Sequence, residues 1–458
     1  MTAIRQDVFR AYDIRGTVGP GFDADAYRLI GHAFGTEMSN AGLTSVAVGY
    51  DGRLTSPELE EALVDGLLKA GRKVVRVGRG PSPMLYYATY ELATDAGLMI
   101  TGSHNPPEFN GIKLTMKGRA FFGDDIEKLQ QLCESDLPTV EGGTAETVDV
   151  RDDYTQRMAG DFKGERALSV VWDPGNGAGG EIVERLAALL PGTHRIINGE
   201  IDGTFPAHHP DPTVEANLAD LKDAVIGEGA DLGIALDGDA DRIGLVDRFG
   251  RVVWGDQLLV ILAREVLADH PGAPILCDVK GSRVFFEEIE KLGGEPVMWK
   301  AGHSHIKTKM AELNSPLAGE MSAHIFFKHR YYGFDDALYA AVRLLSILAS
   351  GKEDLDMLLD ALPPMFNTPE IRFDCDDTLK FQAVENILGK LRQEPDASFS
   401  DIDGIRAETA DGWWQLRASN TQPMLVVRCE SDTLQGLERL KDDVRRRLIA
   451  ESIDPQFT

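Results

Sequence analysis

Short apolar runs rich in β-branched residues recur along the chain, and most are followed by a polar loop and an amphipathic segment of helical spacing. The clearest pairs are residues 45–50 with 56–70 and 168–172 with 181–190. Residues 232–236 and 274–279 are further apolar runs that lead directly into polar loops. Because ligands of open α/β sheets bind at strand ends, this alternation predicts α/β layers with functional loops at the ends of the strands.

The last quarter of the chain has a different pattern. Strands are expected there at 371–373, 413–416 and 424–429, followed by a helix at 436–450. Strands and helices alternate less regularly in this part, which is typical of an α+β domain. Breaks near 137–143, 247–250 and 361–364 divide the chain, so we expect four domains, over residues 1–147, 148–250, 251–363 and 364–458.

Composition and charge limit the partners of the protein. The chain has 458 residues, 43% of them hydrophobic, which is enough for several cores. With 47 Lys and Arg against 74 Asp and Glu, its formal charge is -27, so nucleic-acid backbones and anionic membranes are repelled over most of the surface. We therefore expect no nucleic-acid or membrane partner, and an anionic substrate requires a local cationic pocket.

The cysteines and the N-terminus indicate a compartment. The four cysteines are scattered without a CxxC pair, at Cys133, Cys277, Cys375 and Cys429. This spacing suits reduced thiols in a cytosol and shows no zinc site. Residues 1–16 lack the apolar core of a signal peptide, and no apolar stretch approaches ~18 residues. We expect a soluble cytoplasmic protein.

The segment Thr101-Gly-Ser-His-Asn-Pro106 places a hydroxyl beside an imidazole on a loop after the apolar run 96–101. Alone, it is also a sound turn sequence. Its neighbours add chemistry, because His104 and Lys113 are close in sequence and either side chain can donate or accept a proton. Ser103 is therefore the candidate nucleophile and phosphoryl carrier.

Asp237, Asp239 and Asp241 follow a predicted strand on alternate residues, so their carboxylates can converge on one hard cation. The spacing also resembles the start of an EF-hand, but the sixth and twelfth positions are Arg242 and Arg248 where Gly and Glu are needed. Mg²⁺ is preferred, and a phosphate oxygen fills one of its open positions. Arg242 is placed to offset charge on a phosphoryl group in transfer.

Further candidates are grouped in short segments. Residues 319–324 hold a carboxylate, a hydroxyl and an imidazole, and residues 417–421 hold a guanidinium, hydroxyls and an amide that suit a phosphate dianion. These side chains are Glu320, Ser322 and His324 in the first segment and Arg417, Ser419, Asn420 and Thr421 in the second. Weaker candidates are Tyr12, Arg15, Lys280, His303 and Lys307.

With these four segments in this order, the chain resembles the α-D-phosphohexomutase family, and specifically its phosphomannomutase/phosphoglucomutase branch. The resemblance spans nearly the whole length. It implies three similar mixed α/β sheet domains and a smaller C-terminal α+β domain around a central cleft, each contributing one loop. These are the phosphoserine loop at 101–106, the metal loop at 237–242, the sugar loop at 319–324 and the phosphate loop at 417–421.

The resemblance also implies a reaction. Phospho-Ser103 gives its phosphoryl group to a hexose monophosphate, a hexose 1,6-bisphosphate turns over, and the other phosphate returns, so phosphate moves between O1 and O6. One Mg²⁺ is bound by Asp237, Asp239, Asp241 and the group on Ser103. Lys113 and His324 transfer protons, with Arg15, His104 and Arg242 in support. The substrate-binding residues are Tyr12, Lys280, His303, Glu320, Ser322, Arg417, Ser419, Asn420 and Thr421.

The sugar loop favours mannose and glucose phosphates, because the glucosamine branch usually has Gln at the position of Met321. The chain departs from its branch at Ala323, where Gly is usual. Phosphoglucosamine mutase, a sugar-phosphate phosphatase and a phosphosugar-binding protein without turnover stay open. Residues 175–180 also satisfy GxGxxG, so a dinucleotide-binding dehydrogenase is a rival. We expect a monomer with small phosphosugars as partners.

Overall fold

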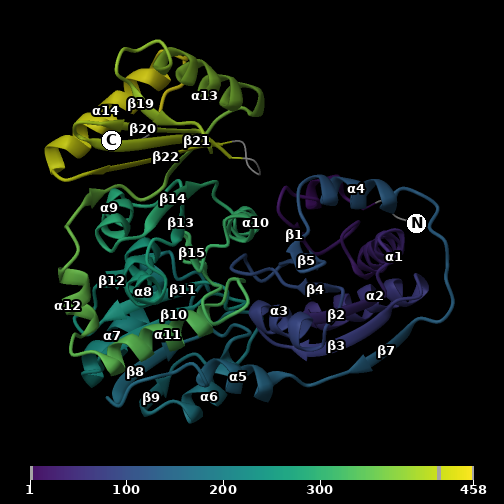
Figure 1. The fold of residues 1–458 in the computed structure, drawn as a ribbon. Coiled ribbons are helices and arrows are strands. Elements are labelled where there is room, and N and C mark those ends of the chain that lie inside the picture. The colour runs from purple at the N-terminus through teal and green to yellow at the C-terminus, as the bar shows by residue number, and fades with distance from the viewer. Residues whose placement is uncertain (1–3, 420–423, 456–458) are drawn as a thin grey trace.

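The computed structural model describes residues 4–419 and 424–455. Four sheets follow one another along the chain, three with mixed strand directions and a last one that is antiparallel (Figure 1). This confirms the predicted fold class. Within the described residues, no helix is both long and apolar enough to span a membrane.

The first sheet has seven strands in the order β1-β5-β4-β2-β3-β7, with β6 beside β5. Strands β4, β2, β3 and β7 are parallel, and β5 is antiparallel to its neighbours. The strands are β1 (Ile14–Thr17), β2 (Ser45–Tyr50), β3 (Lys73–Arg79), β4 (Ala96–Ile100), β5 (Phe109–Met116), β6 (Arg119–Ala120) and β7 (Thr144–Thr147). The helices are η1 (Gln6–Val8), α1 (Ala24–Asn40), α2 (Ser56–Lys69), α3 (Ser82–Glu91) and α4 (Asp124–Cys133).

The second and third sheets have the orders β12-β11-β10-β8-β9 and β14-β13-β15-β16. The second unit contains α5 (Arg151–Ala159), β8 (Leu168–Asp173), α6 (Gly180–Leu189), β9 (Gly192–Ile196), η2 (Glu215–Leu218), α7 (Ala219–Glu228), β10 (Leu232–Leu236), β11 (Ile243–Asp247) and β12 (Val252–Val253). The third contains α8 (Gly255–Asp269), β13 (Pro274–Asp278), α9 (Arg283–Lys291), β14 (Glu295–Trp299), α10 (His303–Leu313), β15 (Leu317–Gly319), β16 (Ile325–Phe327), α11 (Ala337–Ser350) and α12 (Leu355–Asp360).

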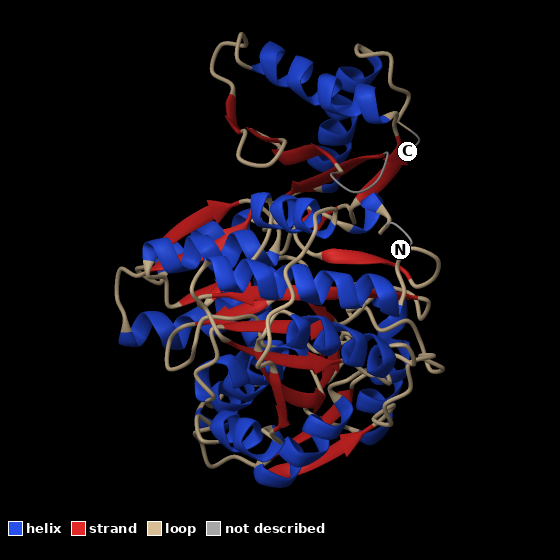
Figure 2. Cartoon of the chain, turned by 90° about the vertical axis from the view of Figure 1, so that its right-hand side faces the viewer, coloured by secondary structure: helices blue, strands red, loops and turns tan. Residues whose placement is uncertain are grey.

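The C-terminal unit is an antiparallel sheet in the order β17-β22-β21-β20-β19, with β18 beside β22. It lies above the rest of the molecule in both views (Figures 1 and 2), and Figure 1 shows β14 and α9 directly below it. Its elements are β17 (Phe366–Asn367), β18 (Ile371–Asp374), α13 (Asp377–Leu391), β19 (Ser398–Ser400), β20 (Ile405–Thr409), β21 (Gly412–Ala418), β22 (Met424–Ser431) and α14 (Leu434–Ile449).

One apolar cluster runs through all three α/β units, from α3 through β8 and β10 to α8 and α11. Within it, the ring of Tyr86 packs 5.6 Å from that of Phe334, centroid to centroid. The C-terminal unit has a separate core around Trp414 and Leu440. We therefore refer to residues 4–363 as the body and to the described residues from 364 to 455 as the cap.

Candidate active site

Ser103 lies on the loop that leaves the end of β4, and its side chain is buried. Its Oγ atom is 3.1 Å from Asp237 Oδ2 and 3.2 Å from His104 Nδ1. The backbone of Ser103 has a φ of 49°, a left-handed conformation that costs free energy in a residue other than glycine. The loop is thus held so that the hydroxyl faces the metal loop.

Arg53 holds this loop in place. Its fully buried guanidinium donates to the backbone carbonyls of Ser103, Asn105, Pro106 and Phe109, at 2.5–3.0 Å. The Asp51 carboxylate, 3.2 Å from Arg53 Nε, compensates the buried charge and also accepts a hydrogen bond from the Gly102 N–H. The sequence interpretation missed Arg53, although an Asp-Gly-Arg segment directly after β2 was a signal.

The three aspartates converge as predicted after β10, with one oxygen of each within 4.8 Å of the others. Asp237 Oδ1 accepts from the N–H groups of Asp241 and Arg242 at 3.0 and 3.1 Å. The loop also needs its glycine, because a Cβ on Gly238 would lie 2.3 Å from the carbonyl oxygen of Ser103. The metal loop and the phosphoserine loop are therefore in direct backbone contact.

The donor set fits a hard divalent cation. Carboxylate and hydroxyl oxygens are the ligands that Mg²⁺ prefers. Oδ1 of Asp239 and Oδ1 of Asp241 are buried and have no hydrogen-bond partner among the described residues, so each has a free lone pair. Burial and the two neighbouring aspartates raise the pKa of Asp237 well above its usual value, as expected where carboxylates crowd together.

Lys113, on β5, reaches this cluster. Its Nζ atom is 2.6 Å from Asp239 Oδ2 and also pairs with Asp241. Burial alone lowers the pKa of Lys113, but the two carboxylates outweigh it and raise the pKa well above the ordinary value. The side chain is therefore a cation. The Oγ of Ser82, at the start of α3, donates to the same carboxylate of Asp239.

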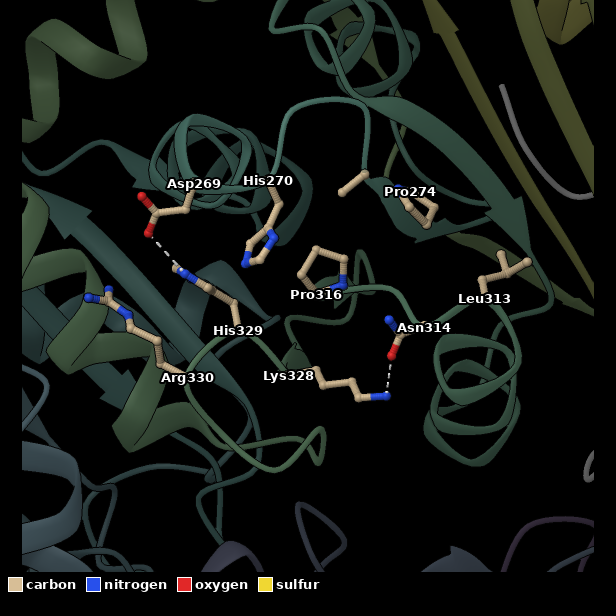
Figure 3. A pocket seen from close by; sticks show the side chains of 10 residues that line it. Asp269, His270, Pro274, Leu313, Asn314, Pro316, Lys328, His329 and Arg330 are labelled. Atoms are coloured by element: carbon tan, nitrogen blue, oxygen red, sulfur yellow. Dashed lines mark hydrogen bonds and ion pairs between the residues drawn. The ribbon is translucent and has the colours of Figure 1, made fainter.

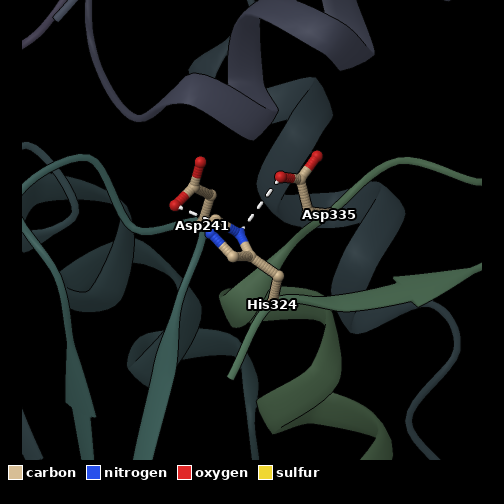
Figure 4. Close-up of side chains that lie close together, drawn as sticks. All are labelled: Asp241, His324 and Asp335. Atoms are coloured by element: carbon tan, nitrogen blue, oxygen red, sulfur yellow. Dashed lines mark ion pairs between the residues drawn. The ribbon is translucent and has the colours of Figure 1, made fainter. Parts of the chain in front are cut away.

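The sugar loop meets the metal loop at His324. The Nε of Arg242 donates to His324 Nε2 at 3.0 Å, and the two residues also form a backbone bridge. On its other side, His324 Nδ1 is 3.5 Å from Asp241 Oδ1 and 3.2 Å from Asp335 Oδ2 (Figure 4). His303, the first residue of α10, stacks on the ring of His324 at 5.6 Å. The sequence interpretation missed Asp335.

Glu320 ties the sugar loop to α10. Its Oε1 accepts from the Gly302 N–H at 2.6 Å, and Oε2 has no partner among the described residues. Burial is the main cause that raises the pKa of Glu320. Ser322 is half-buried on the same loop, and Ala323 has a φ of 66°. One carboxylate oxygen of Glu320 is thus left without a partner among the described residues, on a loop that is tied to the start of α10.

The N-terminal candidates lie beside the phosphoserine loop and the third unit. Arg15, on β1, donates to Asn105 Oδ1 at 2.8 Å and pairs with Asp13 at 2.5 Å. The ring of Tyr12 meets that of His305 edge-on at 5.3 Å, so it reaches α10. Burial, Arg242 and Arg15 lower the pKa of His104 well below its usual value, which keeps this imidazole neutral.

The remaining candidates lie at the boundary of body and cap. Lys280 Nζ is 3.2 Å from Glu370 Oε1 and 3.5 Å from Asp278 Oδ2. Arg417 Nη1 is 3.4 Å from Asp403, which also accepts from the Ala301 N–H at 3.3 Å. These contacts bring Arg417 to the start of α10 but do not join it to Ser103. Ser419 is buried after β21, and Asn420 and Thr421 lie outside the described residues.

The glycine-rich segment 175–180 lies behind the metal loop. The Ala178 N–H donates to the carbonyl of Gly238 at 2.9 Å, and a Cβ on Gly177 would lie 2.9 Å from the same oxygen. Close packing on the metal loop therefore explains Gly177 without a bound dinucleotide.

A separate surface pocket of about 790 Å³ contains none of the predicted site residues (Figure 3). His329 on its wall lies between Asp269, 3.0 Å from Nε2, and Arg343, 3.0 Å from Nδ1. Both ring nitrogens are thus engaged, and this imidazole has none free for chemistry.

Comparison with known proteins agrees with this geometry. Four family models match in order: phosphoglucomutase/phosphomannomutase alpha/beta/alpha domain I over residues 6–138, domain II over 152–250, domain III over 254–366 and the C-terminal domain over 370–447. A phosphomannomutase/phosphoglucomutase of Pseudomonas putida is 44% identical over 99% of this chain and 98% of its own. A phosphoglucomutase of Neisseria gonorrhoeae is 40% identical over the same shares, 99% and 98%.

A solved structure gives the same result. A phosphoglucomutase/phosphomannomutase family protein from Burkholderia thailandensis superposes with a TM-score of 0.91 at 42% identity, covering 98% of each chain. The matching family models together account for most of the sequence, and the relatives align over nearly their full length. The chain therefore belongs to the phosphoglucomutase/phosphomannomutase family.

Proposed function

We propose that this protein is a phosphohexomutase that interconverts the 1-phosphates and 6-phosphates of mannose and glucose through phospho-Ser103 and a hexose 1,6-bisphosphate. The observation that carries the proposal is the distance of 3.1 Å between Ser103 Oγ and Asp237 Oδ2, at a site where three buried aspartates meet Lys113. Relatives named for both activities align over nearly the whole chain.

The residues around Ser103 support phosphoryl transfer. Mg²⁺, bound by Asp237, Asp239, Asp241 and the group on Ser103, would supply charge neutralisation at the phosphoryl oxygens. Lys113 and Arg242 are cations at the same place and would offset the charge on the equatorial oxygens. Arg15 fixes Asn105 of the loop, and neutral His104 contacts Ser103 Oγ, so both would orient the carrier.

In the first half-reaction, the bond from Ser103 Oγ to phosphorus breaks as the bond from a sugar hydroxyl oxygen to phosphorus forms. The hydroxyl proton passes to a base, for which His324 is the candidate. Lys113 is a cation, so it would act as the acid that gives a proton to the leaving oxygen. The bisphosphate then turns, and its other phosphoryl group returns to Ser103. The net change is a shift of phosphate between O1 and O6.

Substrate recognition falls to the third unit and the cap. Glu320 and Ser322 would bind the sugar hydroxyls. Lys280, which pairs with Glu370, and His303 and Tyr12, which contact His324 and His305, would complete the sugar site. Arg417 and Ser419, with Asn420 and Thr421, would bind the phosphate that is not reacting, which fits a guanidinium. The Met at 321 favours mannose and glucose over glucosamine phosphates.

The test is ³¹P NMR with Mg²⁺, catalytic glucose 1,6-bisphosphate and either mannose 1-phosphate or glucose 1-phosphate. We expect the 6-phosphates to appear, a loss of turnover of at least about 1,000-fold in Ser103→Ala, and no turnover after EDTA until Mg²⁺ is restored. Ser135→Ala, at an exposed hydroxyl of the first unit, is the matched control.

Two outcomes contradict the proposal. Near-wild-type turnover in Ser103→Ala would remove this residue as phosphoryl carrier. Release of inorganic phosphate as the main product would make the protein a sugar-phosphate phosphatase instead.

A further inference from the structure

Asp335 and Asp336 are adjacent buried carboxylates between β16 and α11, and they serve different parts of the molecule. Asp336 caps α11 by accepting from the Tyr339 N–H, and it accepts from the hydroxyls of Tyr154 and Tyr331 at 2.9 Å. Asp335 points the other way, toward the sugar loop. A backbone bridge from Asp335 to Phe326 on β16 fixes its position.

Each oxygen of the Asp335 carboxylate lies near a different side chain. Lys307 Nζ is 3.0 Å from Oδ1, and His324 Nδ1 is 3.2 Å from Oδ2. The second contact is a close approach of charge to imidazole, because neither Nδ1 nor Oδ2 has a hydrogen-bond partner among the described residues. Burial by itself raises the pKa of Asp335, but Lys307, His324 and His303 outweigh it and hold the pKa well below the usual range. A fully buried, ionised carboxylate thus lies against one nitrogen of the candidate proton-transfer residue.

The opposite nitrogen of His324 shows where the ring proton is. Arg242 Nε donates to Nε2 at 3.0 Å, and a guanidinium cannot accept, so Nε2 must carry the lone pair. A neutral imidazole has one N–H, which therefore lies on Nδ1 and faces Asp335 and Asp241. A metal ion bound at Nδ1 would need that lone pair and leave no place for the proton. The contacts hence favour a proton on Nδ1 beside the carboxylate, 3.2 Å from Oδ2, over a second metal site.

We infer that Asp335 is a positioning residue for proton transfer: it fixes His324 as the Nδ1–H tautomer and so reserves Nε2 for the sugar hydroxyl. Arg242 covers Nε2 in this structure, so proton transfer requires its guanidinium to turn away from this nitrogen. Stacking on His303 at 5.6 Å keeps the ring plane in place. The inference rests on the mutase reaction proposed above, with His324 as the proton-transfer residue.

The first experiment is independent of turnover. In protein with ¹⁵N-labelled histidine, two-dimensional ¹H–¹⁵N correlation of the imidazole ring distinguishes the tautomers, and His324→Gln assigns the signals. We expect the Nδ1–H pattern for His324 in the wild type. In Asp335→Asn we expect the Nε2–H pattern, because the asparagine amide donates to Nδ1 and the Arg242 guanidinium then turns away from Nε2. An Nε2–H pattern in the wild type overturns the inference, even if Asp335→Asn does not fold.

The second experiment separates positioning from structure. We expect kcat of Asp335→Asn to fall by about 100-fold and KM by less than about threefold in either direction. Adding Asp335→Asn to His324→Gln should cause no further loss, since both act through one imidazole. Asp336→Asn, the matched control, should lower the melting temperature but preserve kcat.

Additive losses in the double variant, or a second metal ion per chain that Asp335→Asn no longer binds, would overturn the inference. A wild-type protein with the Nδ1–H pattern and no mutase turnover would instead refute the proposed function and leave the tautomer assignment standing.

Discussion

The body and the cap are held together by different physics. One apolar cluster joins the three units of the body, so the phosphoserine, metal and sugar loops are fixed relative to one another. The cap has its own core and meets the body through polar side chains such as Arg406 and Glu430. Opening an apolar interface exposes apolar surface to water, which costs free energy. Opening a polar interface exchanges its hydrogen bonds for bonds to water at little net cost. The body is therefore suited to positioned chemistry and the cap to movement around a substrate.

The largest effect is expected inside the body, at Arg53. In Arg53→Met, Asp51 loses its partner and the four loop carbonyls lose their donor, so we expect the free energy of unfolding to fall by about 3–5 kcal/mol. Urea unfolding measures the loss. Arg119→Met is the control in the same unit, because it removes an exposed pair with Asp125, worth less than about 1 kcal/mol. Equal losses in both variants would show that Arg53 does not hold the body together.

The boundary between body and cap gives the next largest effect. Arg406 donates to the carbonyls of Val279 and Gly281 at 2.8 and 2.6 Å. Arg406→Met should loosen the cap and raise KM about tenfold, equal to ~1.4 kcal/mol, with a smaller change in kcat. Steady-state kinetics and limited proteolysis near residues 361–370 measure this. Arg439→Met, at an exposed pair with Asp411, is the control, and an unchanged KM in Arg406→Met would contradict the comparison.

A smaller effect is expected in the sugar loop, at Ala323. Its φ of 66° is a conformation in which a Cβ costs about 1–2 kcal/mol, and the extra freedom of glycine in the unfolded chain cancels part of that gain. Ala323→Gly should therefore raise the free energy of unfolding by about 0.5–1 kcal/mol. Ala318→Gly, on the buried strand β15 of the same unit, should instead lower it. Destabilisation of both variants would exclude strain at Ala323.

The smallest effect is the dependence of stability on pH through histidine. It concerns the body alone, because all ten histidines lie at or before residue 329. A hydrogen bond from His208 Nε2 to Asp173 at 2.9 Å raises the pKa of His208. The contribution of this hydrogen bond to the free energy of unfolding is complete below the unfolded histidine pKa of about 6.5. It is lost as the pH rises through the raised pKa of the folded state.

His208→Gln should therefore destabilise the protein by less than about 1 kcal/mol at pH 5.5. The difference in stability between the variant and the wild type should be smaller at pH 8. Thermal unfolding of both proteins at the two pH values measures this. A difference in stability that grows as the pH rises would refute the role given to the contact of His208 with Asp173. His209→Gln is the control, at the adjacent residue.

The sequence was sufficient where one short segment carries both a strand and its chemistry. The strands expected at 45–50 and 232–236 are β2 and β10, and the helix expected at 56–70 is α2 within one residue. The aspartates after β10 converge because alternate residues of a tight loop can face one point. The fold class and the family were accessible for the same reason, since each depends on local patterns.

Residues that act at long range could not be found in this way. Arg53 binds the carbonyl of Ser103, 50 positions away, and nothing near Arg53 in sequence indicates that partner. Asp335 and Asp336 are the same residue type on adjacent positions, and only the packing of β16 and α11 sends one to the site and one to the core. The sequence did not decide whether Lys307 faces solvent or the site. The same packing brings it to Asp335.

The apolar cluster of the body also sets an order of events during synthesis. Tyr86 of α3 packs against Phe334, which leaves the ribosome about 250 residues later. At about 5–20 residues per second, the contact between Tyr86 and Phe334 forms on the order of 10–50 s after α3 is made. The core shared by the three units of the body is therefore completed only when the third unit has been made, whereas the cap, closed on its own core, can fold independently of that core.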